Sequence, residues 1–300
     1  MGKQGFIRFL TAGFVLGIGL VWGVVTSLPD RQLHLVVCDV GQGDATLISM
    51  QSTQVLVDGG PDDRVIDCLS EHMPFWDREV EVLVLSHPQA DHMNGLVKVL
   101  QRYKISEVVV SGATSQTEDF SAFRTAVLDE GATLHFARKG DEIRLASLSL
   151  LVLWPREPLG SVSLWQKENI DTTVLGVGTA VGNVNEESVV LLAKYGDFRA
   201  LLVGDIGMKT EQALLGEGVL ERVDVLKVAH HGSKYASSSD FLSAIQPQFA
   251  IISVGAKNRY GHPASDTLIR LDRVGVDILR TDELGDVEII TDGKEIWEKG

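Results

Sequence analysis

The stretch LSHPQADHMNGL at residues 85–96 places two histidines and an aspartate within six residues, directly after an apolar, strand-like run. His87, Asp91 and His92 would be costly to remove from water at the end of a buried strand unless they had a partner. A divalent cation satisfies imidazole and carboxylate groups together. The stretch therefore predicts a metal-binding turn. Its unusual feature is Gln89, a neutral amide where a further strong ligand would be expected.

Polar groups also follow other apolar runs of the sequence. A single aspartate at a strand end is usually a turn former, and His34, His72 and His135 are interpreted as ordinary surface or core histidines. Several strand ends together are different, because sites are commonly built where loops leave a rigid scaffold. If the strands lie side by side, these groups converge at one rim: Asp39, Asp44, Asp58, Asp205, His230, His231, Asn258, Tyr260 and His262.

After Pro29, short β-branched runs alternate with amphipathic segments. The pattern predicts two sheets packed face to face with helices outside, an α+β, four-layer fold. A long loop is expected over 156–185. Strands are expected at 33–40, 45–50, 53–58, 80–86, 106–112, 132–137, 141–145, 148–155, 187–195, 198–205, 223–232, 248–255, 276–281 and 285–293. Helices are expected at 62–72, 91–102, 118–130 (ended by Gly131), 209–215, 238–245 and 265–274.

Residues 9–28 form an uncharged, apolar run preceded by Lys3 and Arg8. Its twenty residues can span a bilayer as a helix, and the upstream positive charges favour a cytoplasmic N-terminus. The favoured interpretation is a single-pass membrane anchor over 1–30, with the remaining domain, 31–300, on the extracytoplasmic side. A cleaved signal peptide and a buried soluble helix remain the alternatives.

Composition limits the function further. With 300 residues and 44% hydrophobic content, the chain can form one large core. The net charge of −14 excludes an extensive basic face, so any phosphate-binding surface must be local, or a bound cation must supply the positive charge. Two cysteines, Cys38 and Cys68, are too few for a disulfide framework and lack metal-site spacing, and Cys38 is expected to be buried. Lys227 and Lys257 lie near the predicted rim, either as phosphate ligands or as ordinary solvated lysines.

Four motifs resemble the metallo-β-lactamase superfamily, whose first motif is H-x-H-x-D-H: HPQADHMNG, VLVDGG, LLVGDI and HHGS. A finer resemblance is to the soluble, extracytoplasmic domain of the competence protein ComEC, over roughly 33–291. It rests on the segments CDVGQGDATLI, LVDGG, LSHPQADHMNGL, SVVLLAKYGDFRALLVGDI, DVLKVAHHGS and NRYGHP. The resemblance implies an αββα sandwich, here preceded by one transmembrane helix.

The family pattern also implies roles for single residues. Asp91, His92, Asp205 and His231 would form one metal site, and Asp205 would bridge to a second metal held by His87. His230 would donate a proton or bind a phosphate oxygen, although the reverse assignment of the two histidines stays open, and His262 would be a ligand or a proton donor. Asp58 would orient a ligand imidazole, and Asp39 and Asp44 would form the floor beneath the metals. Substrate would be contacted by Ser233, Lys234, Asn258 and Arg259.

The chain departs from that pattern in two ways. Gln89 stands where the superfamily has histidine and ComEC-like sequences often have aspartate. No histidine occurs between His135 and His230, so the usual mid-chain ligand is absent. The second metal would depend on His87 and Asp205, with Gln89 and Asn185 as weak ligands. One or two ions are expected, and oxygen-rich ligation moves the preference from Zn²⁺ toward Mn²⁺.

The resemblance implies a membrane-anchored phosphodiesterase or nuclease that acts on single-stranded DNA, or on another phosphodiester, during DNA uptake. Because the chain has a single apolar span, a separate DNA-channel protein would be its partner. Two alternatives stay open. One is a cell-envelope or small-molecule phosphoesterase or lactamase-like hydrolase. The other is a non-catalytic binding module with a degenerate metal site, for which Gln89 is the motive.

Overall fold

The computed structural model describes residues 14, 17–18, 29–158, 165 and 183–299. The expected membrane helix over 9–28 lies outside this part of the chain except at positions 14, 17 and 18, as does most of the expected loop 156–185. Within the described ranges, no helix is both long enough and apolar enough to cross a bilayer.

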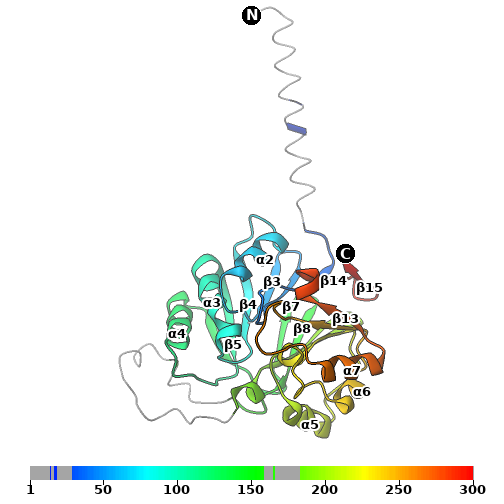
Figure 1. Ribbon diagram of the computed structural model, residues 1–300. Coiled ribbons are helices and arrows are strands. Elements are labelled where there is room, and N and C mark those ends of the chain that lie inside the picture. The colour runs from blue at the N-terminus through cyan, green and yellow to red at the C-terminus, as the bar shows by residue number, and fades with distance from the viewer. Residues whose placement is uncertain (1–13, 15–16, 19–28, 159–164, 166–182, 300) are drawn as a thin grey trace, which may run out of the picture.

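The first sheet has eight strands, mostly from the N-terminal half of the chain (Figure 1). Their bounds are β1 Leu33–Val37, β2 Thr46–Met50, β3 Thr53–Val57, β4 Glu79–Leu85, β5 Lys104–Val110, β6 Thr133–Phe136, β14 Val287–Thr291 and β15 Ile296–Lys299. The order across the sheet is β15-β14-β1-β2-β3-β4-β5-β6. Pairing is antiparallel from β15 to β3 and parallel from β3 to β6.

The second sheet has seven strands from the C-terminal half. Their bounds are β7 Glu142–Leu145, β8 Leu148–Trp154, β9 Val190–Tyr195, β10 Phe198–Leu202, β11 Val225–Lys227, β12 Phe249–Ile252 and β13 Asp277–Arg280. The order is β13-β12-β11-β10-β9-β8-β7, with β10 to β13 parallel and β7 to β10 antiparallel. Both sheets therefore combine an antiparallel part with a parallel part whose crossovers carry helices.

Helices cover the outer face of each sheet (Figure 1). The first sheet is covered by α2 Arg64–His72, α3 Ala90–Arg102 and α4 Glu118–Glu130; the second by α5 Met208–Glu217, α6 Ser239–Ile245 and α7 Ser265–Val274. Three apolar layers separate these elements: one between the sheets, and one between each sheet and its helices. The predicted four-layer αββα sandwich is confirmed for the described residues.

The period-two pattern of β1 shows how one strand serves two cores. Leu33, Leu35 and Val37 face the second sheet, whereas Val36 faces the helices. Successive strand side chains point to opposite faces, and both faces of this strand are covered, so the run is almost continuously apolar.

Most predicted elements form with boundaries shifted by a few residues. The predicted end of α4 at Gly131 is confirmed, since this glycine has φ of 76°, and Thr117 caps the start of the helix by accepting the Phe120 N–H at 3.2 Å. Not predicted were β15, the short helix α8 Thr281–Leu284, and the 3₁₀ turns η3 Val184–Glu187 and η4 Ala229–Gly232. These elements are too short to show a periodic signal.

The turn after β3 and the first turns of α3 are in close contact. A Cβ atom on Gly95 would lie 1.9 Å from the carbonyl oxygen of Gly59, and one on Gly43 would lie 2.3 Å from the carbonyl oxygen of Asp91. Glycine is required at both positions because the backbones approach so closely. This packing fixes the start of α3, which carries Asp91 and His92, against the end of β3.

The two cysteines form a disulfide, which is a correction to the sequence-based expectation. Cys38, at the end of β1, is buried as predicted, but its sulfur is bonded to that of Cys68 on α2. The residues are 30 positions apart in sequence, with Cα atoms 5.9 Å apart. Two cysteines with no framework pattern do not predict pairing, because the contact depends on α2 folding back over β1.

Candidate metal centre

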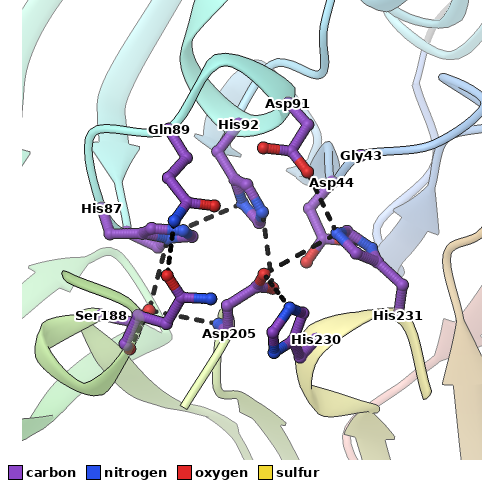
Figure 2. Close-up of polar contacts among 12 residues, drawn as sticks. Gly43, Asp44, His87, Gln89, Asp91, His92, Ser188, Asp205, His230 and His231 are labelled. Atoms are coloured by element: carbon purple, nitrogen blue, oxygen red, sulfur yellow. Dashed lines mark hydrogen bonds and ion pairs between the residues drawn. The ribbon is translucent and has the colours of Figure 1, made fainter. Parts of the chain in front are cut away.

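Polar side chains from both sheets meet at one end of the sandwich (Figure 2). The strands β1, β3, β4, β10 and β11 all end there, as expected for a site built from strand ends. The structure brings seven of the residues predicted for the rim together here: Asp58 after β3, His87 after β4, Asp91 and His92 on the first turn of α3, Asp205 after β10, and His230 and His231 on η4; Asp44 lies beside His231 as well.

The three buried histidines share one arrangement. Nδ1 of His92 lies 2.8 Å from Asp58 Oδ2, Nδ1 of His231 lies 3.0 Å from the Ser253 carbonyl oxygen, and Nδ1 of His87 lies 3.0 Å from Ser86 Oγ. Among the described residues, none of the three Nε2 atoms has a hydrogen-bond partner. A histidine whose Nδ1 is hydrogen-bonded presents Nε2 in a fixed direction, which is how ligand imidazoles are oriented in metal sites.

Asp205 lies at the centre of the cluster. Its carboxylate oxygens are 3.4 Å from Nε2 of His92, 3.6 Å from Nε2 of His230 and 3.8 Å from Nε2 of His231. Asp91 lies on the other side of His231, with Oδ2 3.5 Å from its Nε2. Three-residue groups that could hold a cation are accordingly His87–His92–Asp205, Asp91–His92–His231 and Asp44–Asp205–His231.

Electrostatics link the carboxylates to the imidazoles. Burial alone would lower the pKa of both His92 and His231. The negative charges of Asp205 and Asp58 outweigh this effect at His92, and those of Asp205 and Asp44 outweigh it at His231. The pKa of His92 is held well above its ordinary value, and that of His231 is raised to about 10. For His87, burial dominates and lowers the pKa to about 4. Positive charge is therefore favoured in the middle of the cluster, and a divalent cation would supply the same charge.

The backbone of η4 separates the two adjacent histidines. His230 and His231 have φ values of 51° and 53°, in the left-handed region that residues other than glycine rarely adopt. Each such conformation costs on the order of 1–3 kcal/mol and is found mainly where a site requires it. His231 is directed into the cluster and is buried, whereas 33% of the His230 side chain remains exposed at its opening.

Gln89 does not point freely at a cation. Its side-chain amide donates to Asn185 Oδ1 at 2.5 Å, so the two expected weak ligands are bonded to each other. Asn185 belongs to η3 and is buried, and Gln89 immediately precedes α3. The hydrogen bond joins the segment between β4 and α3 to the turn that precedes β9, and Figure 2 shows Gln89 beside His87. The side of the cluster around His87 therefore offers fewer free ligand atoms than the side around His231.

Two of the three aspartates expected behind the ligands are in place. Asp58 accepts from Ser86 N–H at 2.8 Å as well as lying against His92, and Asp44 Oδ1 lies 3.3 Å from Nδ1 of His231. The structure does not bring Asp39 to the cluster: this residue is exposed and accepts the Gly41 N–H at 3.1 Å. Its backbone N–H donates to Asp286 Oδ1 at 2.6 Å, so Asp39 lies beside the residue that precedes β14.

The residues expected to contact substrate fall into two groups. Ser233 is buried. The Asn258 side chain forms hydrogen bonds to the backbone of Gly255 and His262 within its own loop, so neither residue faces the opening. Lys227 is also buried, in an ion pair with Asp44 at 2.7 Å, which excludes the expected phosphate contact. Lys234 and Arg259 are exposed as expected.

Sequence reasoning missed several supporting groups. Ser86, Ser188 and Ser253 hold the imidazoles of His87 and His231 in place. Tyr235 was also missed; it is exposed, with Lys234 Nζ 4.9 Å above its ring, and the predicted rim residue Tyr260 is likewise exposed, with the Arg259 guanidinium 5.3 Å above its ring. The serines carry no sequence signal because their role depends on packing, whereas Tyr235 could have been found as the neighbour of a predicted basic residue.

The donor set fits a divalent cation. Nε2 of His87, His92 and His231 and Oδ1 of Asp205 are buried and have no hydrogen-bond partner among the described residues. Unsatisfied polar atoms in the interior are rare because each carries a desolvation penalty. Four of them directed into one space, with imidazole and carboxylate chemistry, form the kind of set that binds transition metals.

The chain belongs to the metallo-beta-lactamase superfamily, whose family model matches residues 38–256. Its curated relatives are competence proteins of the ComEC type. It is 28% identical over 272 residues to ComE operon protein 3 of Bacillus subtilis, covering 83% of this chain and 32% of that protein. It is 29% identical over 268 residues to Recombination protein 2 of Haemophilus influenzae, covering 88% and 29%. The chain thus spans about a third of the length of these relatives.

Solved structures confirm the fold alone. The metallo-beta-lactamase fold protein YhfI from Bacillus subtilis matches with a TM-score of 0.54 at 10% identity, covering 90% of this chain and all of that one. CmlA, a diiron beta-hydroxylase from Streptomyces venezuelae, matches with a TM-score of 0.50 at 14% identity, covering 84% and 53%. Because CmlA is a hydroxylase, the shared fold does not define the reaction, which must be argued from the site.

Proposed function

We propose that this protein is a metal-dependent hydrolase. The observation that carries the proposal is the set of four buried ligand atoms on His87, His92, His231 and Asp205 that have no hydrogen-bond partner among the described residues. Asp91, His92, Asp205 and His231 would hold the principal cation. His87 and Asp205 would hold a second one more weakly, because the amides of Gln89 and Asn185 are bonded to each other.

A bound divalent cation supplies Lewis acidity, which makes water nucleophilic near neutral pH and stabilises charge on the attacked centre. The protein's own proton-handling groups lie at the opening. The His230 and His262 rings are 5.8 Å apart, and His230 is partly exposed. Burial, together with the charges of His231 and His230, lowers the pKa of His262 to about 4, so this imidazole is neutral at pH 7. It is then a weak base, better suited to donating a hydrogen bond or binding a cation than to accepting a proton.

The substrate class we propose is a phosphodiester, with single-stranded DNA as the favoured example. The relatives are competence proteins, and the opening carries two pairs of a basic and an aromatic side chain, Lys234–Tyr235 and Arg259–Tyr260. Basic groups that track phosphates and aromatic rings that stack on bases are the two elements of single-strand binding. Both pairs are local, as the net charge of −14 requires.

A small-molecule or cell-envelope phosphoesterase is the second candidate. The strongly acidic chain favours it, since a net charge of −14 repels a polyanion over most of the surface. The two candidates differ in whether the basic–aromatic pairs matter. A polymer would contact them, whereas a small phosphodiester would contact the cation site alone.

We also propose that residues 9–28 anchor the protein in a membrane with the domain on the extracytoplasmic side. The Cys38–Cys68 disulfide supports that side, because disulfides persist in oxidising compartments and are rare in the cytosol. In this setting the domain would act beside a separate DNA-channel protein.

The test is a paired assay on the purified chain, dialysed against chelator and reloaded with Mn²⁺ or Zn²⁺. Labelled single-stranded DNA and bis-nitrophenyl phosphate are supplied in parallel. Asp205→Asn should lose bound metal and at least 100-fold in rate on both substrates, since its carboxylate contacts three of the histidines. Lys234→Ala with Arg259→Ala should slow DNA cleavage about tenfold and leave the small substrate unchanged.

Each hypothesis has its own failing result. A chain that binds no transition metal by mass spectrometry contradicts the hydrolase proposal and leaves the non-catalytic binding module. Turnover of the small substrate without DNA cleavage contradicts the nuclease and favours the phosphoesterase.

A further inference from the structure

Two aromatic side chains project from the loop that joins α2 to β4. Phe75 is 73% exposed and Trp76 is 44% exposed, and their rings pack edge to face with centroids 4.8 Å apart. Residues 73–78, which we call the aromatic loop, have the sequence MPFWDR. Large side chains of this kind are normally buried, and two adjacent exposed aromatic rings indicate a surface that contacts something else.

The aromatic loop is well held, so the exposure of its rings is not caused by a loose backbone. Met73 N–H donates to the Leu69 carbonyl oxygen at 2.9 Å, and Asp77 N–H donates to the Pro74 carbonyl oxygen at 2.8 Å. The Asp77 carboxylate accepts from the side-chain amide of Gln54 on β3 at 3.2 Å. The turn held by these hydrogen bonds directs both rings outward.

The aromatic loop lies at the end of the first sheet where the chain enters it. Leu33, the first residue of β1, pairs with Met50 at the end of β2, which pairs with Thr53 at the start of β3. β3 and β4 are parallel, so the loop preceding Glu79 lies at this same end. In Figure 1, α2 and the residues leading into β1 lie at the same end of the molecule.

The candidate metal centre lies at the opposite end. β1, β3 and β4 run away from the aromatic loop, and Asp58 and His87 follow the far ends of β3 and β4. A strand of five residues extends about 16 Å, at about 3.3 Å per residue. The sheet therefore separates an end with exposed aromatic rings from an end with exposed catalytic and basic groups.

Charge at the aromatic-loop end is negative on balance, as it is for the chain as a whole: Glu71, Asp77, Glu79 and Glu81 lie within six residues of Phe75. Arg78 and Lys104 are exposed there, and Lys104 is paired with Glu79 at 2.8 Å. Charge therefore does not attract this end to a membrane, and the apolar rings of Phe75 and Trp76 would supply the attachment.

We propose that the aromatic loop inserts Phe75 and Trp76 into the headgroup region of the bilayer and orients the domain with the metal centre facing away from the membrane. This inference rests on the proposed anchoring by residues 9–28, which enter the domain four residues before β1. Tryptophan is enriched at membrane–water interfaces, and tryptophan and phenylalanine form the apolar face of segments that lie in the interface. Together the anchor and the loop make two attachments, which fix an orientation that one flexible attachment does not.

The test uses the full chain reconstituted in phosphatidylcholine vesicles. The two native cysteines are joined in a disulfide, so an introduced cysteine is the reactive thiol for an environment-sensitive fluorophore. Probes are placed at Phe14→Cys in the anchor, Arg78→Cys in the aromatic loop and Asp266→Cys at the metal-centre end. Quenching by a lipid spin-labelled near the headgroup is measured, with aqueous iodide as the complementary quencher.

Lipid quenching at position 78 should be at least twofold stronger than at position 266. Replacing the pair with Phe75→Ser and Trp76→Ser should halve quenching at position 78 and leave quenching at position 14 unchanged. Both rings are exposed, so the double variant should melt like the parent chain.

Three results overturn the proposal. If position 14 is quenched while 78 and 266 respond alike, the anchor holds but the loop does not insert. If position 78 is shielded from both lipid and iodide, protein covers the loop instead of lipid. If position 14 is not quenched, the anchoring itself fails, and the loop proposal fails with it.

Discussion

At the level of single residues, the candidate site depends on which nitrogen each histidine presents. Nδ1 of His92 and His231 lies against Asp58 Oδ2 and the Ser253 carbonyl oxygen, so Nε2 is left for a ligand. Three imidazoles and Asp205 then form an uneven centre. It is well supplied with ligands around His231 and poorly supplied around His87, where Gln89 and Asn185 bind each other.

The uneven centre predicts the effect of one substitution. Gln89→His should raise affinity for a second cation roughly tenfold, or about 1.4 kcal/mol, because it breaks the bond to Asn185 and adds an imidazole beside His87. Gln89→Leu, which breaks the same bond without adding a ligand, is the matched control. Equilibrium dialysis with Mn²⁺ or Zn²⁺ measures stoichiometry and affinity. Equal binding by the two variants would show that position 89 does not face the centre.

At the level of elements, the contact between α3 and the turn after β3 determines where the ligands of α3 lie. Gly95→Ala should destabilise the fold by about 3 kcal/mol, because overpacking of a tight contact has costs of this order. Gly216→Ala on α5 is the matched control: its Cβ meets nothing within 4 Å, so it should be neutral or slightly stabilising. Urea unfolding of both variants checks this, and similar midpoints would argue against the close contact.

The pairing of β1 with β14 carries a pH-dependent ion pair. His34 Nδ1 lies 2.6 Å from Glu288 Oε1. Burial opposes the negative charge on Glu288, but His34 and Lys299 outweigh it and lower the pKa of Glu288 from 4.5 to about 2. In turn, the hydrogen bond to Glu288 raises the pKa of His34 above 6.5. Stability from Glu288 is lost as pH falls from 4.5 toward 2, and stability from His34 is lost as pH rises above 6.5.

The pair should therefore stabilise most between pH 4.5 and 6.5. Glu288→Gln should cost about 1 kcal/mol at pH 5.5 and less at pH 8.5, where Lys299 remains as a partner but His34 carries less positive charge. Thermal unfolding of both chains at the two pH values tests this. A loss that is the same at both pH values would show that His34 does not contribute.

At the level of the whole molecule, the disulfide joins β1 to α2, and it supports the proposed extracytoplasmic location of the domain. The bond closes a loop of 30 residues, so its loss should destabilise the chain by about 3–4 kcal/mol by the loop-entropy estimate. Reductant should lower the urea midpoint of the parent chain and leave the Cys38→Ala, Cys68→Ala variant unchanged. Thiols that react in the native, unreduced chain would contradict the pairing.

Much of the molecule follows from local sequence. Alternation in the strands, the glycine stop after α4 and the polar residues at strand ends are properties of short segments, and they predicted the two sheets, most helices and seven of the converging side chains. The same kind of reasoning placed Ser233, Asn258 and Lys227 at the opening. It failed there because burial depends on which segment covers which, and a loop closed by Asn258 or an ion pair of Lys227 with Asp44 carries no local signal.

The sequence by itself thus determined the fold class and the kinds of side chain at the candidate site, because periodicity and residue chemistry are encoded along the chain, and its motifs resembled those of the superfamily to which it belongs. Only the tertiary structure decided that Cys38 meets Cys68, that Gln89 meets Asn185, and that Phe75 and Trp76 stand at the end of the sheet opposite the metal centre. Each of these joins residues from different elements. Their meeting depends on sheet order and helix placement, which packing of the whole core sets.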